Sequence, residues 1–143
     1  MLLILSYPYL GPIPEEIGYL NQLEFLQWSF NRFSGSIPSK LLNMSSLINL
    51  YLENNNLSGI IPSNMGYSLP NLQYLHLNDN NFVGNIPNTI FNSSKLIQFQ
   101  LNNNAFNGTL PNNAFGNLRF LETIHIVNNN LTIDDSLQFF TSL

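Results

Sequence analysis

The sequence repeats itself with a period of 24 or 25 residues, and this periodicity restricts the chain to a small set of folds. Aligned on its leucines, the chain divides into four complete units, with a degenerate unit before them and a partial unit after them. The complete units are 23–46, 47–71, 72–95 and 96–120, the degenerate unit is 1–22 and the partial unit is 121–143. Because one unit cannot bury its own apolar face, we expect the units to stack as coils of a single domain.

Each unit opens with the pattern L-x-x-L-x-L-x-x-N-x-L, as in "LINLYLENNNL" and "LQYLHLNDNNF". Its apolar residues alternate with period two, which predicts a short strand with one buried face. The same alternation places Leu2 and Ile4 in an opening strand. The segment G-x-I-P follows, and we expect it to turn the chain into a second extended stretch, since proline fixes φ. It begins at Gly11, Gly35, Gly59, Gly84 and Gly108. Later apolar residues should fill the back of the coil: Ile17, Leu20, Leu41, Met44, Ile90 and Leu118.

The composition excludes several functional classes. Charged residues make up 8% of the chain, against the usual quarter or so, and the net charge is -4 with four Lys and Arg residues. So few cations argue against a nucleic-acid interface. The chain has no cysteine, which excludes disulfides, thiolate metal sites and a cysteine nucleophile. The first ten residues lack the basic region and cleavage site of a signal peptide, and no apolar run is long enough for a transmembrane helix.

Asparagine recurs at the ninth position of each unit. We expect these side chains to point inward, where a carboxamide both donates and accepts hydrogen bonds and can satisfy the backbone of its own coil and of the next. This predicted structural ladder consists of Asn31, Asn55, Asn80, Asn104 and Asn129, and it should end at Tyr7 in the opening unit. Of the other asparagines, Asn54, Asn103 and Asn128 should lie at strand ends, whereas Asn56 and Asn130 should face solvent.

The leucine pattern, the G-x-I-P segment and the 24-residue period together resemble the ectodomain repeats of plant leucine-rich-repeat receptor kinases and receptor-like proteins. The resemblance covers essentially the whole chain. It implies an α/β fold, a right-handed leucine-rich-repeat solenoid or horseshoe with a parallel β-sheet on its concave face; an ordinary globular α/β domain is the competing fold. The tail "NNNLTIDDSLQFFTSL" drops G-x-I-P and resembles a unit of the subfamily that includes sensors of bacterial flagellin and elongation factor.

The resemblance also implies a function, which is binding a peptide or protein outside the cell, in defence or developmental signalling, with recruitment of a co-receptor kinase. We expect this chain to be an internal slice of such a receptor, without caps, membrane anchor or kinase domain, and therefore without catalysis or a cofactor. Uncapped ends predict self-association. The alternative is a stand-alone soluble inhibitor or adaptor, like the plant repeat proteins that block cell-wall-degrading enzymes.

A ligand would lie along the side chains that flank the leucines of each strand, because these point to the concave face. Tyr, His, Gln and Asn on a rigid sheet are typical of recognition surfaces, although they are also ordinary polar residues of an exposed sheet. Ser29 and Val127 occupy equivalent positions of the repeat and should point to the same face. We call the predicted ligand-binding residues the concave strip, which consists of Phe25, Gln27, Asn49, Tyr51, Glu53, Tyr74, His76, Asn78, Gln98, Gln100, Asn102, Thr123 and His125.

Other candidate sites are weaker. His76 and His125 should lie about 10 Å apart, two strand spacings, which is too far to share one metal ion. The acidic pairs Glu15–Glu16 and Asp134–Asp135 accompany no nucleophile, so a catalytic role is not expected. Trp28 should be core, and Phe30 could be exposed. Five N-x-S/T motifs predict N-glycosylation, two on the convex side and three in loops that leave the sheet: Asn43, Asn92, Asn56, Asn107 and Asn130.

Overall fold

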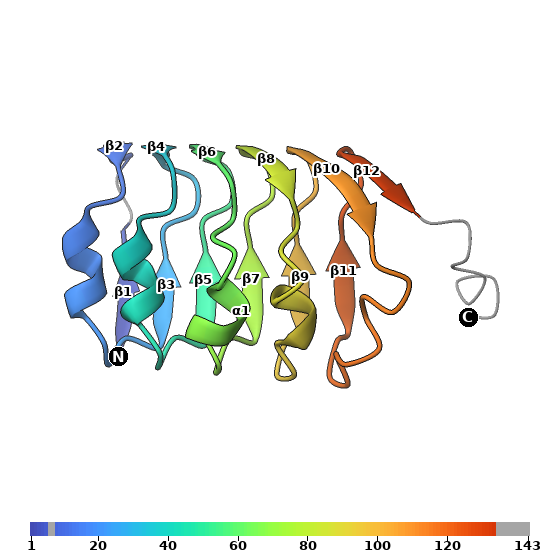
Figure 1. Cartoon of the computed structure of the whole chain (residues 1–143). Helices are drawn as coiled ribbons and strands as arrows, with labels where there is room; N and C mark the ends of the chain where they lie inside the picture. Colours follow the sequence, from blue (N-terminus) through green and yellow to red (C-terminus); the bar gives the residue numbers. More distant parts are fainter. Residues whose placement is uncertain (6–7, 134–143) are drawn as a thin grey trace.

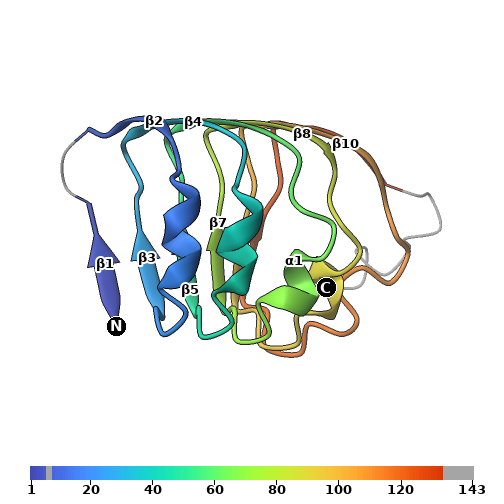
Figure 2. The same cartoon turned by 60° about the vertical axis from the view of Figure 1, so that its left-hand side comes forward.

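The computed structural model describes residues 1–5 and 8–133. The chain winds into a stack of coils, and each coil contributes one strand to each of two six-stranded parallel sheets (Figure 1). Turning the view shows the coils side by side, with corresponding strands in line (Figure 2). The predicted solenoid of stacked units is therefore confirmed, and so is its parallel sheet.

The first sheet contains the strand of the leucine pattern from every coil. Its register aligns Leu26 with Leu50 and Leu50 with Leu75, so the buried leucines form a column across the sheet. In chain order the strands are β1 (Leu2–Ile4), β3 (Phe25–Gln27), β5 (Asn49–Tyr51), β7 (Tyr74–His76), β9 (Gln98–Gln100) and β11 (Thr123–His125). Leu2 and Ile4 do lie in a strand, but they pair with Phe25 and Gln27 and are exposed, because Leu3 is the residue that aligns with the leucine column.

A second sheet runs along the stack, which the leucine pattern did not predict. We expected G-x-I-P to begin the second extended stretch, but the strands of this sheet come before it. The first five of them end at or near the glycine of G-x-I-P, and all five of these glycines have φ between 74° and 117°. Only glycine adopts that backbone without steric cost, so the turn toward the back of the coil is made there. The strands are β2 (Leu10–Pro12), β4 (Arg32–Gly35), β6 (Asn56–Gly59), β8 (Asn81–Asn85), β10 (Ala105–Leu110) and β12 (Asn130–Ile133).

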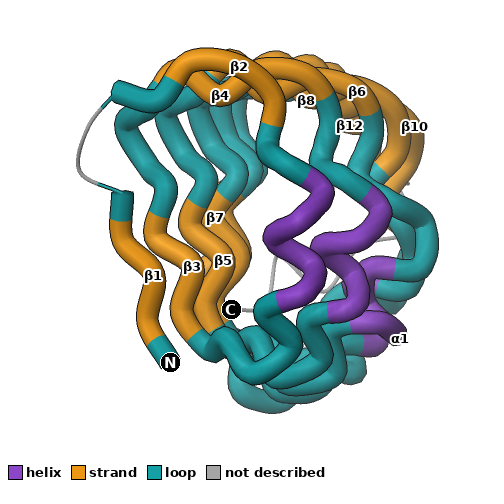
Figure 3. The backbone as a smooth tube through the Cα atoms, turned by 90° about the vertical axis from the view of Figure 1, so that its left-hand side faces the viewer, coloured by secondary structure: helices purple, strands orange, loops and turns teal. Residues whose placement is uncertain are grey.

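Short helices complete the back of the coils. They face the first sheet across the core, and the second sheet bridges the two sides (Figure 3). Three are 3₁₀-helices, namely η1 (Glu15–Tyr19), η2 (Ser39–Asn43) and η3 (Ile90–Asn92), and α1 (Met65–Ser68) is a single α-helical turn. A proline stands just before η1 and η2 as the N-cap, Pro14 and Pro38, because proline suits a helix start and resists continuation of the preceding strand.

One continuous hydrophobic core runs through the stack. It contains the strand leucines, the residues at the start of the second sheet and the predicted back-filling residues, of which Leu41, Met44 and Ile90 have no exposed surface. At the amino-terminal end Trp28 stacks on Phe33 with ring centroids 4.9 Å apart, and Tyr9 stacks on the same phenylalanine. The expectation that Trp28 is a core residue is correct.

Candidate functional site

The concave strip lies on the outer face of the first sheet, opposite the core. The alternation is clear in β5, where Leu50 is fully buried and Tyr51 is partly exposed. The strip is not uniformly open, because Asn49 on β5 and Ser29, two residues after β3, are only 6% and 7% exposed.

An aromatic cluster occupies the middle of the strip. The ring of Tyr51 lies 4.6 Å from the His76 ring and 6.4 Å from the Tyr74 ring, measured between centroids. Asn49 Nδ2 donates a 2.6 Å hydrogen bond to the Tyr51 hydroxyl, and His76 Nε2 lies 3.1 Å from Gln98 Oε1. These contacts hold the rings in fixed positions, which lowers the entropic cost of binding a ligand against them.

Burial changes the chemistry of two rings in this cluster. It is the main reason that the pKa of Tyr51 is raised and the pKa of His76 is lowered, since both shifts favour the neutral form. The negative charge of Glu53 acts in the opposite direction on His76 but does not outweigh burial. Burial in this cluster therefore disfavours a charge on Tyr51 and on His76.

The rest of the strip lies on either side of this cluster. Phe25 is 37% exposed at the amino-terminal end, and Gln27 bonds to the Ser29 hydroxyl at 2.8 Å. Toward the carboxyl end, Gln100, Asn102 and Thr123 are partly exposed and His125 is exposed. The structure thus brings together the members on β5 and β7, with Gln98 beside them. Among residues 1–5 and 8–133, no three His, Cys, Asp or Glu residues are close enough to hold a metal ion.

The asparagines of the ladder bind the backbone of two coils each. Asn55 Oδ1 accepts from the Phe33 N–H at 3.0 Å, and its Nδ2 donates to the carbonyls of Trp28 and Leu52, both at 3.0 Å. Asn80, Asn104 and Asn129 repeat this arrangement. Asn31 accepts from the Tyr9 N–H of the opening coil, while Tyr7, where we expected the ladder to end, lies outside the described residues.

The residue before each ladder asparagine has a role that sequence reasoning missed. Its backbone is left-handed, with φ of 55° or 56°, in all five coils where the structure describes it. Asparagine and aspartate tolerate this conformation better than other non-glycine residues, which explains why asparagines stand in runs here. The residues are Phe30, Asn54, Asp79, Asn103 and Asn128. The enrichment in Asn and Asp was the signal that could have revealed the conformation.

All five N-x-S/T asparagines are exposed, but three are not in loops. Asn56 and Asn130 begin β6 and β12, and Asn107 lies within β10. The expectation of loops was wrong because the stretch after the ladder pairs into the second sheet. Asn43 and Asn92 lie on the helical side, at the ends of η2 and η3. None of the five lies on the outer face of the first sheet.

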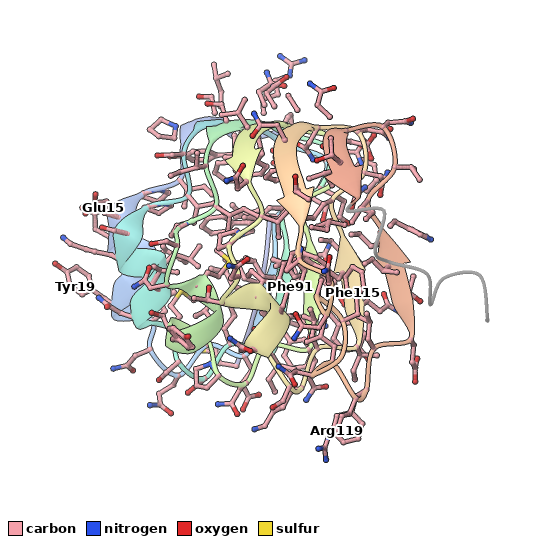
Figure 4. The ribbon with its side chains drawn as sticks, turned by 45° about the vertical axis from the view of Figure 1, so that its right-hand side comes forward. Glu15, Tyr19, Phe91, Phe115 and Arg119 are labelled. Atoms are coloured by element: carbon pink, nitrogen blue, oxygen red, sulfur yellow. The ribbon has the colours of Figure 1, made fainter. Side chains whose placement is uncertain are left out.

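The helical side carries structural contacts. Glu15 lies 3.4 Å from the Lys40 ammonium, which also sits 5.7 Å from the centre of the Tyr19 ring (Figure 4). Further along the stack, Phe91 and Phe115 make an edge-to-face contact with centroids 5.7 Å apart. Glu15 of the pair Glu15–Glu16 thus makes a surface ion pair, and Asp134–Asp135 lies outside the described residues.

Comparison with known proteins decides the family. Residues 45–92 match the family described as Leucine Rich repeats (2 copies), and residues 22–44 match the family described as Leucine Rich Repeat. The ectodomain of the receptor kinase SOBIR1 from Arabidopsis thaliana superimposes with a TM-score of 0.85 at 31% identity, over 92% of this chain and 72% of that one. The chain belongs to the leucine-rich-repeat family.

Other relatives of this leucine-rich-repeat chain are also plant receptors. Receptor-like protein 31 of Arabidopsis thaliana is 50% identical over 58 residues, which is 40% of this chain and 7% of that protein. The Arabidopsis receptor kinase HAESA, in complex with the peptide hormone IDA and the co-receptor SERK1, matches with a TM-score of 0.76 and 27% identity over 91% of this chain and 26% of that one. The chain thus spans a small part of these receptors. No helix in its described part is long and apolar enough to cross a membrane.

Proposed function

We propose that this leucine-rich-repeat chain is a ligand-recognition part of a plant receptor ectodomain and binds an extended peptide or protein segment along the concave strip. The observation that carries the proposal is the fixed cluster of Tyr51, Tyr74 and His76 in the middle of the outer sheet face. Aromatic rings with a polar atom at their edge provide contact area at low entropic cost. Five strands spaced about 4.8 Å apart give a surface about 20 Å long, which suits about six extended residues.

The relatives support this proposal, since HAESA is described in complex with a peptide hormone and a co-receptor. By the same likeness, we propose that the chain acts outside the cell in defence or developmental signalling, with glycans on its exposed N-x-S/T asparagines. The resemblance of its tail to flagellin and elongation-factor sensors points to that subfamily. A co-receptor is the proposed protein partner, and exposed Leu2 and Ile4 on β1 would support self-association. A stand-alone inhibitor is not favoured, because the relatives are receptors.

A binding screen tests the proposal. The full chain is immobilised and exposed to a library of extended peptides, and the peptides retained are measured against a variant that combines Tyr51→Ala, Tyr74→Ala and His76→Ala. We expect the triple variant to lose binding at least tenfold. The matched control, Tyr19→Ala with Tyr67→Ala, removes two exposed rings from the helical side and should leave binding unchanged. Peptides that bind the triple variant as well as the original chain would refute the proposal.

A further inference from the structure

Three buried oxygen atoms on the concave strip have no hydrogen-bond donor. They are Asn49 Oδ1, Glu53 Oε2 and Asn78 Oδ1, and all belong to the coils of β5 and β7. Asn49 Oδ1 lies apart from the other two, because Asn49 pairs with Tyr74, four residues before Glu53, and turning its amide over would let the oxygen accept from the Tyr51 hydroxyl. Buried acceptors are nearly always satisfied in folded proteins, so the two unpaired oxygens of Glu53 and Asn78 suggest that a donor is missing. We call Glu53, Asn78 and the adjacent Asp79 the acceptor patch.

Glu53 and Asn78 are neighbours across adjacent coils. Tyr51 pairs with His76, and the Asn54 N–H donates to the Asn78 carbonyl at 3.1 Å, so the same register sets Glu53 opposite Asn78. Asn78 Nδ2 donates to Asp79 Oδ2 at 2.7 Å. Turning this amide over would place its oxygen against the Asp79 carboxylate instead. One acceptor of the patch therefore stays unpaired in either orientation.

The patch carries two negative charges and no positive partner. The sequence holds four Lys and Arg residues. Arg32 lies in β4 of the other sheet, Lys40 pairs with Glu15 on the helical side, Arg119 lies in the turn before β11, and the Lys95 ammonium bonds to Asn71 Oδ1. Among the described residues, the two ion pairs involve Glu15 and Glu24 only.

The surroundings suit a charged donor on an apolar stem. Tyr51 and His76 lie two residues before Glu53 and Asn78 on the same face, so their rings are next to the patch. Burial lowers the pKa of His76, which disfavours a positive charge on this ring. Phe30 is 75% exposed, and its N–H bonds to the Glu53 carbonyl at 3.0 Å, so this aromatic residue flanks the patch. Aromatic rings attract cations and also pack against aliphatic stems.

We propose that the ligand of the concave strip presents a basic side chain, the guanidinium of an arginine or the ammonium of a lysine, to the acceptor patch. This inference rests on the proposed function and adds the chemistry of the ligand. The several N–H groups of one such side chain reach the unpaired oxygens of Glu53 and Asn78 together, and its charge balances Glu53 and Asp79. A peptide without a basic residue leaves these acceptors unpaired and is rejected.

A small probe tests the patch directly. Arginine amide is titrated into the full chain and followed by NMR, with neutral citrulline amide as the isosteric comparison. We expect saturable shifts at Tyr51, His76 and Asn78 for arginine amide, and at least tenfold weaker binding of citrulline amide. Glu53→Gln and, independently, Asp79→Asn should each weaken the arginine probe about tenfold, as expected for the loss of a charged hydrogen-bond partner. Glu15→Gln on the helical side makes the same charge change and should have no effect.

The outcomes separate this inference from the proposed function. Equal binding of the two probes, or no change in both Glu53→Gln and Asp79→Asn with the fold retained by circular dichroism, would overturn it, as would displacement of arginine amide by Ca²⁺ at equal concentration. If the library yields peptides that lack Arg and Lys and ignore Glu53→Gln, the concave strip still binds peptides and only this inference is wrong. If no peptide binds but arginine amide behaves as expected, the patch stands and the proposed function fails.

Discussion

The side-chain oxygen of Asn55 accepts a hydrogen bond of 3.0 Å from the backbone N–H of Phe33, which lies one coil earlier in the stack. The same carboxamide donates to carbonyls of both coils. Asn55→Ala leaves these buried groups unpaired, so we expect the free energy of unfolding to fall by about 2–4 kcal/mol. Urea denaturation measures the loss. Asn56→Ala, one residue on and exposed, should change stability by no more than about 0.5 kcal/mol, and a loss as large as that of Asn55→Ala would contradict the ladder.

Phe30 adopts a φ of 56°, a backbone conformation that costs a bulky residue roughly 1–2 kcal/mol. Four other coils place Asn or Asp there. Phe30→Asn should therefore raise the unfolding midpoint by an amount equivalent to about 0.5–1 kcal/mol. The reciprocal change Asn54→Phe should lower it. Thermal denaturation of both variants measures the two changes. A lower unfolding midpoint for Phe30→Asn together with a higher one for Asn54→Phe would show that the exposed ring, rather than the backbone, determines stability at this position.

Gly66 lies in α1 where a Cβ atom would fall on the Thr89 carbonyl oxygen of the next coil. Although alanine favours a helix, Gly66→Ala should destabilise the chain by about 1–3 kcal/mol, because the coils must move apart to admit the methyl group. Gly116→Ala is the control, since its Cβ would come no closer than 3.4 Å to the Asn113 carbonyl oxygen. Chemical denaturation compares the two, and equal effects would mean that the coils can separate freely at α1.

His76 makes stability depend on pH. Its folded pKa lies below the ordinary value of 6.5, chiefly because burial disfavours the charged ring. As pH falls from above 6.5 toward that lower value, the unfolded chain binds more protons than the folded chain, so the free energy of unfolding falls. His76→Gln should reduce this slope, whereas Gln100→Ala, a non-titrating change on β9, should keep it. Denaturation midpoints at pH 7 and pH 5.5 provide the measurement, and an unchanged slope in His76→Gln would assign the effect elsewhere.

The sequence predicted much of the fold, because its information is periodic. Leu26, Leu50 and Leu75 recur in one phase, and a period of two within a period of 24 or 25 residues leaves few alternatives to stacked parallel strands. The second sheet was harder to foresee. The pairing of Asn56 with Ser34 depends on how far the coils approach, and the short polar stretch after each ladder asparagine shows no strong strand pattern.

The candidate site was predictable in position but not in detail. The alternation placed Tyr51 and Tyr74 on the same face as Asn49. It could not show that Asn49 is buried while holding the Tyr51 hydroxyl, because that depends on side-chain rotamers in neighbouring strands. The missing donors of Glu53 and Asn78 are likewise a property of packing across coils, and no single unit of sequence contains them.

The reach of each ladder asparagine has an evolutionary consequence. Asn80, for example, serves only its own coil and the one before it. Deleting or duplicating one whole coil therefore brings a ladder asparagine next to an equivalent preceding coil, and no buried amide loses its hydrogen-bond partners. Gaining or losing part of a coil would leave some of these side chains without partners. Repeat chains of this kind can lengthen by duplication or shorten by deletion in steps of one coil, and their outer surface can change without altering the interior.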